Sequence, residues 1–329
     1  VFLKKKILQP SELLADNNIK YFNNHYTIPS FNLYPHQWSW DSAWIVYGYS
    51  ATNQIEKAEK EMITLFNYQW KNGLVPSIIF HNTVNSTYWP NPELWELNEK
   101  ANKLTDKFNS TGIVQPPIHS SACFKIYESN MNKSSGEIFL KKIYPKLFLW
   151  HKYLYEERDL FGEGLAFIRH PWESGMDNSP IWDKALGRIE INDFKYSKFR
   201  TDNKKVNSEE RPTNITYERY IRLIEIFKEC KYNESLICKK SEFVIQDVLF
   251  NVLLLKSNYA LLEIAKIIDK KEDFNTLNNW INKTKNGLNK FYKDGFYYDF
   301  DIVANSHVKV KTISGLSSLL FTSNTKEII

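Results

Sequence analysis

Apolar residues recur along much of the chain at helical spacing. Between Ile55 and Trp70 they fall three or four residues apart, and lysine and glutamate fill much of the opposite face, as is typical of an amphipathic helix. Asn72-Gly73 predicts the end of that helix. The same kind of pattern predicts further helices within residues 34–49, 116–127, 136–157, 211–227, 244–268 and 274–291. Pro145 predicts a break or a restart inside one of them.

The helical pattern changes near the end of the chain. Residues 295–310 alternate aromatic and acidic residues and then continue through His307 to Val310, which predicts a β-hairpin. Strands and helices do not alternate in the way that a parallel sheet requires. Helices of similar length, joined alternately by long and short loops, predict an all-α fold. We expect an α/α toroid in which the long loops form a site at one face.

One segment, residues 169–183, fits neither a helix nor a strand. Pro171 and Pro180 each remove a backbone donor, and Gly175 permits a left-handed backbone. The segment carries one histidine, two tryptophans and three acids: His170, Trp172, Trp182, Glu173, Asp177 and Asp183. Carboxylates beside aromatic faces on an irregular segment are what a sugar-binding cleft requires. The alternative is a loop between helices whose acids are solvated.

Composition agrees with a carbohydrate site and argues against several other classes. Of the 329 residues, 43% are hydrophobic and 25% charged, which is normal for a globular protein. Aromatic residues reach 15% and there are only 11 glycines, so Gly-rich phosphate loops are not expected. The net charge is +5, and the lysines are scattered without a basic stripe, so we expect no nucleic-acid partner.

Cysteine usage and hydropathy predict a cytoplasmic protein. Cys123, Cys230 and Cys238 are odd in number and form no CxxC motif, unlike a disulfide framework. The sequence has no run of 18 apolar residues, so we expect no membrane span. A signal peptide has its charges before its apolar stretch, whereas here the lysine cluster follows the apolar residues that end at Leu3. The scattered histidines and separate cysteines suggest no metal site. We expect no cofactor, no metal and no membrane partner.

Two motifs stand out in the printed sequence. Residues 34–43 read YPHQWSWDSA, and residues 170–183 read HPWESGMDNSPIWD. Further motifs follow in order along nearly the whole chain: Val75-Pro76, Tyr88-Trp89-Pro90, Gln115-Pro116-Pro117, Arg211-Pro212-Thr213, Tyr298-Asp299-Phe300-Asp301 and Ile313-Ser314-Gly315-Leu316. Together they closely resemble glycoside hydrolase family 63, most of all its bacterial mannosylglycerate and glucosylglycerate hydrolase-like branch. The resemblance implies one catalytic domain over residues 1–329, an (α/α)6 barrel and an inverting glycosidase.

The resemblance maps the family's general acid onto Asp177. An inverting enzyme needs one protonated carboxyl and one ionised carboxylate about 6.5–9.5 Å apart. Packing against Trp172 and partial desolvation would raise the pKa of Asp177 and keep it protonated. We expect the other two acids of the segment to be structural: Glu173 as a hydrogen-bonding acid, and Asp183 at the following turn.

The resemblance also implies substrate-binding residues. The first motif supplies the residues that hold the sugar, two tyrosines close over a small aglycone, and Arg211 receives a glycerate-type carboxylate through its bidentate fork. The expected substrate-binding residues are Tyr34, Trp38, Trp40, Asp41, Tyr88, Gln115, Trp172, Gly175, Arg211 and Tyr217. Structural alternatives stay open for three of them: a helix N-cap for Asp41, a salt bridge for Arg211 and a core position for Tyr217.

One part of the family pattern is missing. The family's general-base glutamate follows a Trp-rich stretch beyond the motif at 313–316, and no glutamate in residues 1–329 has that context. We therefore expect a C-terminally incomplete barrel without its last helices. Its exposed apolar edge favours association, with a second copy of the chain or with a completing polypeptide.

The expected function is hydrolysis of a small α-glycoside, mannosylglycerate or glucosylglycerate, with Asp177 as general acid. Two alternatives stay open. The first is a hydrolase of trehalose or an α-gluco-oligosaccharide, which would not need a cation at Arg211. The second is a non-catalytic carbohydrate-binding remnant, because no general base is assigned.

Overall fold

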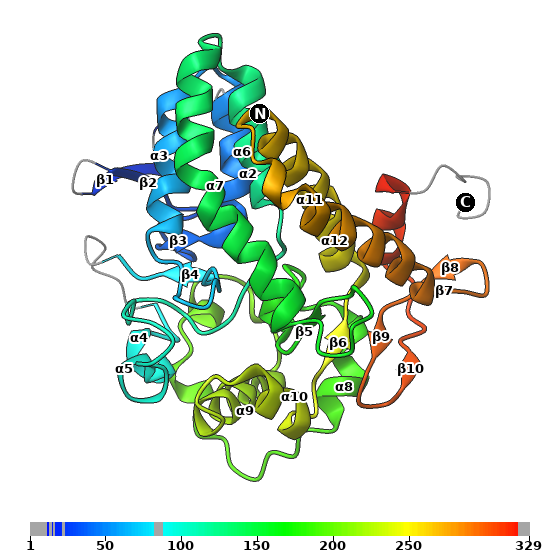
Figure 1. The fold of residues 1–329 in the computed structure, drawn as a ribbon. Helices are drawn as coiled ribbons and strands as arrows, with labels where there is room; N and C mark the ends of the chain where they lie inside the picture. Colours follow the sequence, from blue (N-terminus) through cyan, green and yellow to red (C-terminus); the bar gives the residue numbers. More distant parts are fainter. Residues whose placement is uncertain (1–11, 13–14, 16, 22–23, 82–87, 322–329) are drawn as a thin grey trace, which may run out of the picture.

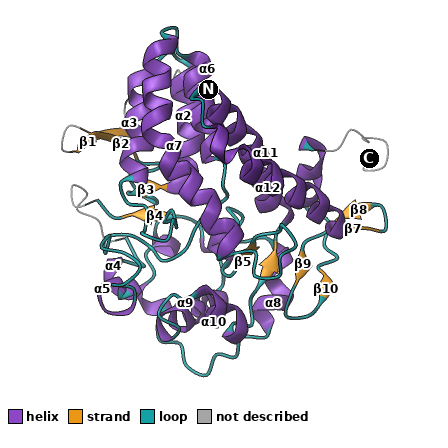
Figure 2. Ribbon diagram, in the orientation of Figure 1, coloured by secondary structure: helices purple, strands orange, loops and turns teal. Residues whose placement is uncertain are grey.

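The protein is described by a computed structural model covering residues 12, 15, 17–21, 24–81 and 88–321, and it is mainly helical (Figure 2). The longer helices are α2 (Ser39–Ala51), α3 (Ile55–Phe66), α6 (His119–Ser129), α7 (Lys133–Glu156), α9 (Asn214–Glu229), α11 (Val248–Ile267) and α12 (Phe274–Gly287). The shorter ones are α4 (Pro92–Trp95), α5 (Leu97–Lys100), α8 (Asp183–Gly187), α10 (Glu234–Lys240) and α13 (Ile313–Leu316). The predicted helical segments are therefore confirmed, and with them the all-α class. The predicted end at Asn72-Gly73 is wrong, because α3 ends at Phe66.

Three pairs of consecutive helices form the body of the fold: α2 with α3, α6 with α7, and α11 with α12 (Figure 1). The first helices of the pairs pack side by side, α2 on α6 and α6 on α11, and form one layer. The second helices form the other layer, in which α3 contacts α7. Small residues at the start of α6 permit this closeness, and the Ser120 amide donates to Ser257 Oγ of α11 at 3.2 Å. Two such layers of helices are the arrangement expected of an α/α toroid.

Polar side chains fix where several helices begin. Asn132, Thr213, Asn233 and Asp247 precede α7, α9, α10 and α11, and each side chain accepts a hydrogen bond from a backbone N–H of the first turn. Such caps satisfy donors that a helix leaves unpaired. The long connections between helix pairs then gather at one end of the bundle, the lower end in Figure 1, where α4, α5, α8, α9 and α10 lie.

Helix α11 is apolar enough, by length and composition, to cross a membrane. It instead packs against α6, α7 and α12, and 72% of its most apolar window is buried in the protein. Leu254, Leu261 and Ile264 are fully buried. The hydropathy of this helix is therefore explained by its place in the core.

The predicted break at Pro145 is wrong, because α7 runs through that residue without interruption. The proline costs one backbone hydrogen bond and strains the preceding turn. Its own position is exposed, while Leu140, Leu147 and Leu154 on the buried face are fully covered. Packing on both sides of the proline outweighs the local rule.

Short antiparallel strands supplement the helices in the described residues. Three pairs are β1 (Asn18–Tyr21) with β2 (Asn24–Thr27), β3 (Gln37–Trp38) with β4 (Ile78–Ile79), and β7 (Tyr292–Lys293) with β8 (Phe296–Tyr297). A four-stranded sheet has the order β10-β9-β6-β5, with β5 (Phe167–Ile168), β6 (Ile245–Gln246), β9 (Phe300–Asp301) and β10 (Ser306–His307). The hairpin predicted at 295–310 is the β9–β10 pair, whereas β8 turns back onto β7.

Two of these pairings position the site. In the β3–β4 pair Trp38 lies opposite Ile78, and α2 begins directly after β3. In the four-stranded sheet Ile168 of β5 lies opposite Ile245 of β6, and β5 leads straight into the irregular segment 169–183. A strand fixed to a distant part of the chain therefore lies within the first motif, and another directly precedes the acid segment.

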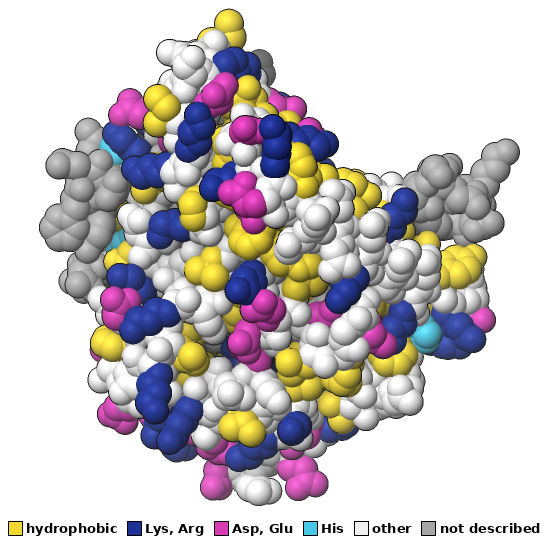
Figure 3. Space-filling model, viewed as in Figure 1, with side chains coloured by type: hydrophobic (Ala, Val, Ile, Leu, Met, Phe, Trp, Pro, Cys, Tyr) yellow, Lys and Arg dark blue, Asp and Glu magenta, His cyan; other side chains and the backbone are white. Residues whose placement is uncertain are grey.

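Positive and negative side chains are mixed on the surface. On the face drawn in Figure 3, Lys and Arg alternate with Asp and Glu. Ion pairs across one helical turn also occur among the described residues, such as Lys60 with Glu56 of α3. Pairs of this kind stabilise a helix only slightly, so the surface charges explain little of the fold.

Candidate active site

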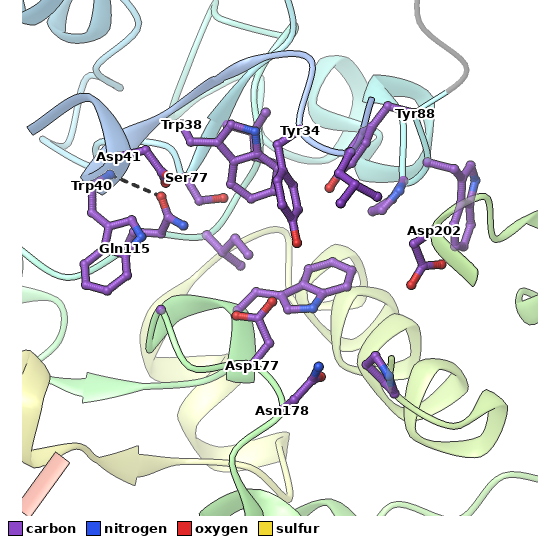
Figure 4. A pocket seen from close by; sticks show the side chains of 18 of the residues that line it. Tyr34, Trp38, Trp40, Asp41, Ser77, Tyr88, Gln115, Asp177, Asn178 and Asp202 are labelled. Atoms are coloured by element: carbon purple, nitrogen blue, oxygen red, sulfur yellow. Dashed lines mark hydrogen bonds between the residues drawn. The ribbon is translucent and has the colours of Figure 1, made fainter. Parts of the chain in front are cut away.

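The long connections meet around one pocket, and all eleven residues predicted from the sequence line it (Figure 4). They are Tyr34, Trp38, Trp40, Asp41, Tyr88, Gln115, Trp172, Gly175, Asp177, Arg211 and Tyr217. The rest of the lining was not predicted: Leu33, Ser77, Ile78, Trp89, Pro90, Trp95, Ile113, Asn178, Asp202 and Pro212. The two sequence motifs thus converge, although more than 100 residues separate them.

Aromatic rings form one wall of the pocket. Trp38 meets Tyr34 edge-on, with ring centroids 5.3 Å apart, and it meets Tyr88 in the same way at 6.0 Å. Figure 4 shows these rings gathered on the side of the cavity opposite Asp177. Edge-to-face contacts hold aromatic rings at defined angles. The wall therefore offers rigid apolar faces beside polar groups.

Asp41 and Gln115 supply polar groups close to that wall. Asp41 lies in the first turn of α2, whose N-cap is Trp38, so the N-cap alternative for Asp41 is wrong. The Trp40 amide donates to Gln115 Oε1 at 3.2 Å (dashed in Figure 4). This bond orients the Gln115 side chain, which is buried.

Asp177 projects into the pocket from the irregular segment. Gly175, two residues earlier, has a φ of +71°, and a Cβ there would lie 2.4 Å from the Trp40 ring. Only glycine permits this approach of the segment to α2. Two further bonds hold the segment: Tyr220 Oη donates to the Asp177 carbonyl at 2.8 Å, and Trp182 Nε1 donates to the Met176 carbonyl at 2.8 Å.

The carboxyl groups of Asp177 and Asp41 have raised pKa values. Burial raises the pKa of Asp177 to about 6, against the opposing effects of its own backbone amide and of Arg211. The side chain is open to the pocket, but the surrounding protein limits its hydration. Burial and, more weakly, the charge of Asp177 raise the pKa of Asp41 to about 6. Burial is therefore the main cause of the raised pKa of both carboxyl groups.

Glu173, four residues before Asp177, has the opposite character. It is fully buried, and Arg158 donates to its two carboxylate oxygens at 2.7 and 3.0 Å. Burial alone would raise the pKa of Glu173, but the Arg158 guanidinium outweighs it and lowers that pKa. Asp183, the third acid of the segment, is exposed in the first turn of α8. Of the three acids, only Asp177 lines the pocket.

His170 orients its neighbours and does not face the pocket. Its Nδ1 accepts the Trp172 amide at 3.0 Å, so the proton is on Nε2, which donates to the Tyr220 carbonyl at 3.1 Å. Burial lowers the pKa of His170 to about 4, and the ring is therefore neutral at physiological pH. Its centroid is 4.5 Å from that of Trp172, which helps to place the tryptophan.

Arg211 is paired with an acid that the sequence did not reveal. Its Nε donates to Asp202 Oδ2 at 2.8 Å and its Nη1 to Tyr34 Oη at 3.3 Å. Arg200 also binds Asp202, at 2.9 and 3.1 Å. Burial opposes ionisation of Asp202, but the two guanidinium groups lower its pKa to about 2. The salt-bridge alternative for Arg211 is thus present, and Arg211 lines the pocket at the same time.

Tyr217 likewise has both of the positions considered for it, one in the core and one in the pocket lining. It is only 5% exposed and belongs to the core, yet it also lines the pocket. The Arg200 guanidinium lies over its ring at 4.4 Å, and its hydroxyl donates to the Trp89 carbonyl at 3.4 Å. Tyr217 therefore connects α9 to the loop that carries Tyr88.

Comparison with protein families gives a match over most of the chain. The model for the mannosylglycerate hydrolase MGH1-like glycoside hydrolase domain matches residues 34–329. A mannosylglycerate hydrolase of Rubrobacter radiotolerans is 38% identical over 92% of this chain and 68% of its own length. A glucosylglycerate hydrolase of Mycolicibacterium hassiacum is 31% identical over 88% of this chain and 66% of its own length. The chain thus spans about two thirds of these relatives.

Comparison with solved structures agrees on the fold. The family 63 mannosylglycerate hydrolase of Thermus thermophilus, in complex with Tris and D-glycerate, superposes with a TM-score of 0.85 at 34% identity. The match covers 97% of this chain and 73% of that one. The predicted helical toroid is therefore confirmed. The roles of the pocket residues stay predictions.

Proposed function

The chain belongs to the mannosylglycerate hydrolase MGH1-like glycoside hydrolases of family 63, and from this premise we propose that it hydrolyses an α-glycoside of glycerate with inversion at the anomeric carbon. Mannosylglycerate and glucosylglycerate are the substrates proposed. One observation carries the proposal: Asp177, with a pKa near 6, faces an aromatic wall and shares its pocket with Arg211. Free cysteines at 123, 230 and 238 support a cytoplasmic location within the same proposal.

The aromatic wall and its polar neighbours form the proposed sugar subsite. The rings of Trp38 and Tyr34 would contact the apolar face of a pyranose. Asp41 would accept hydrogen bonds from sugar hydroxyls, and Gln115 would contribute from beside it. Because Trp38 belongs to β3, Asp41 belongs to α2, and Gln115 is bonded to the Trp40 amide of α2, the sugar would be held in one orientation relative to Asp177.

Asp177 is the proposed general acid. In its protonated form it would donate a proton to the glycosidic oxygen as the bond to the anomeric carbon breaks. A water molecule would form the new bond to that carbon from the opposite face and release a proton to the solvent. Among the described residues, the other carboxylates lining the pocket are Asp41 and Asp202. Asp202 is held by two arginines and Asp41 faces the sugar subsite, so neither is assigned as the base that activates water.

Arg211 is the proposed receptor of the glycerate carboxylate. Two guanidinium groups, from Arg200 and Arg211, share the single carboxylate of Asp202, so one positive charge stays uncompensated in this group of three. A carboxylate on the aglycone would neutralise it through charge-assisted hydrogen bonds. Tyr88 and Tyr217 would close over the small aglycone from the neighbouring wall.

The test compares an anionic substrate with a neutral one. Purified protein is assayed with mannosylglycerate, glucosylglycerate and methyl α-mannoside, and proton NMR records which anomer is released first. We expect the β-anomer of the sugar first. In Arg211→Ala we expect kcat/KM for the glycerate substrates to fall about 100-fold, as for loss of a charge-assisted hydrogen bond, and kcat/KM for the neutral substrate to change less than threefold. An equal loss on both substrates would refute the glycerate assignment.

A further inference from the structure

Four charged residues form a buried network beneath the acid segment: Arg158, Arg169, Glu173 and Glu234. None is more than 2% exposed. Arg158 binds both oxygens of Glu173 and forms an ion pair with Glu234 at 3.1 Å. Arg169 lies 3.8 Å from Glu173 and 3.1 Å from Glu234. Two positive and two negative charges therefore balance inside the protein.

Glu173 differs from Glu234 in that it also binds the backbone. Its Oε2 accepts the Arg169 amide at 2.8 Å, and its Oε1 accepts the Val114 amide at 3.1 Å. Val114 directly precedes Gln115, and Arg169 opens the segment that carries Asp177. One buried carboxylate therefore links the two stretches of chain that supply a proposed sugar contact and the proposed acid.

In the hydrogen bond and ion pairs that the structure gives Glu234, every partner is a side chain. It is in the first turn of α10, and its Oε1 accepts the Tyr153 hydroxyl at 2.7 Å. It faces the same two arginines as Glu173 and is equally buried. The two glutamates thus differ chiefly in their partners: Glu173 accepts two backbone amides, and the partners that the structure gives Glu234 are side chains.

We propose that Glu173 is a positioning residue that fixes Gln115 and Asp177 relative to each other. A buried ion pair by itself is weak grounds for stability, because apolar residues of similar size often replace it without loss. Apolar residues, however, would leave the amides of Val114 and Arg169 without their acceptor, which is costly for buried donors. The carboxylate is needed at this place because it serves two backbone segments and two arginines at once.

The inference rests on the proposed function and is tested with a matched pair, Glu173→Gln and Glu234→Gln. Each removes one buried negative charge beside the same two arginines, and only the first touches the backbone at 114 and 169. We expect a larger drop in melting temperature by calorimetry in Glu173→Gln, because this variant also loses a carboxylate acceptor of two backbone amides. We expect kcat/KM for mannosylglycerate to fall at least tenfold further in Glu173→Gln, mainly through kcat, while Glu234→Gln stays within threefold of the parent after correction for the folded fraction.

Charge-balanced double variants cover the case in which a single variant fails to fold. Arg158→Gln/Glu173→Gln and Arg158→Gln/Glu234→Gln each leave one arginine and one glutamate in the network. We expect the same difference in turnover between them. Equal turnover within either matched pair would overturn the proposal.

A second readout needs no substrate and separates this inference from the proposed function. Amide hydrogen exchange at Val114 and Arg169 is followed by NMR in the unliganded variants. We expect exchange at least tenfold faster in Glu173→Gln than in Glu234→Gln. Unchanged exchange at both amides would refute the positioning role, whereas absence of glycoside turnover in the parent protein would refute only the proposed function.

Discussion

Replacing Asp177 by asparagine should stabilise the protein while it removes the proposed acid. Burial raises the pKa of this carboxyl from 3.8 to about 6, so the fold disfavours its ionised form. The unfolded chain ionises from about pH 4, whereas the folded protein keeps the proton until about pH 6. The stability contributed by the neutral form is therefore lost as the pH rises between these values, and the loss is complete above them.

The size of the effect follows from the shift. A difference of about two pKa units corresponds to about 3 kcal/mol. Because Asp177 is open to pocket water, solvent screening reduces this figure, and we expect Asp177→Asn to raise the free energy of unfolding by about 1 kcal/mol at pH 8. Near pH 4 the gain should be small, because the folded carboxyl is already neutral there.

The assay is urea unfolding followed by tryptophan fluorescence at pH 4 and pH 8. Asp183→Asn is the matched control, since Asp183 belongs to the same segment but does not line the pocket, and its replacement should leave stability within a few tenths of a kcal/mol. Destabilisation of Asp177→Asn at pH 8, or an equal gain at both pH values, would refute the reasoning.

Three further predictions concern the pocket. Gly175→Ala places a Cβ 2.4 Å from the Trp40 ring at a positive φ. We expect the free energy of unfolding, measured by thermal unfolding, to fall by about 1–3 kcal/mol, and kcat to fall as well. Wild-type values for both would contradict the packing described. If Asp177 is the acid, a pH–rate profile should show kcat/KM falling about tenfold per pH unit above pH 6, and a profile flat to pH 8 would exclude that assignment. Arg211→Lys keeps the charge but loses the fork that contacts Asp202 and Tyr34; we expect KM for mannosylglycerate to rise about tenfold with kcat within threefold, measured by initial rates, and an unchanged KM would show that the fork is not used.

Local patterns predicted the helices well because their buried faces are long. The spacing from Ile55 to Trp70 repeats over several turns, so one ambiguous residue does not hide it. Strands β5 and β6 have two residues each, too few for alternation to be visible. Pro145 was misjudged for a related reason: the rule for proline is local, and the packing that overrides it comes from other helices.

The site was predictable where chemistry lies in a contiguous motif. The two motifs contain Asp177, Trp172, Trp38 and Asp41, and the structure brings these residues to one pocket. Asp202 carries no such signal, because it lies in a charged loop and matters only through its contacts with Arg200 and Arg211.

Distinguishing the acids of one segment needs the three-dimensional structure. Glu173 and Asp177 are four residues apart, yet the pKa of one is lowered and that of the other is raised. The difference depends on Arg158, fifteen residues upstream of Glu173, and on which side chain reaches the pocket. Neither fact is visible in the residues of the motif.

The central claim is that Asp177 protonates the leaving group of a glycerate glycoside. The most direct test compares wild type with Asp177→Asn on mannosylglycerate, whose aglycone needs protonation, and on α-mannosyl fluoride, whose fluoride leaves without it. We expect a loss of about 10³-fold on mannosylglycerate and of less than tenfold on the fluoride. Equal losses on the two substrates, or full turnover of mannosylglycerate by Asp177→Asn, would contradict it.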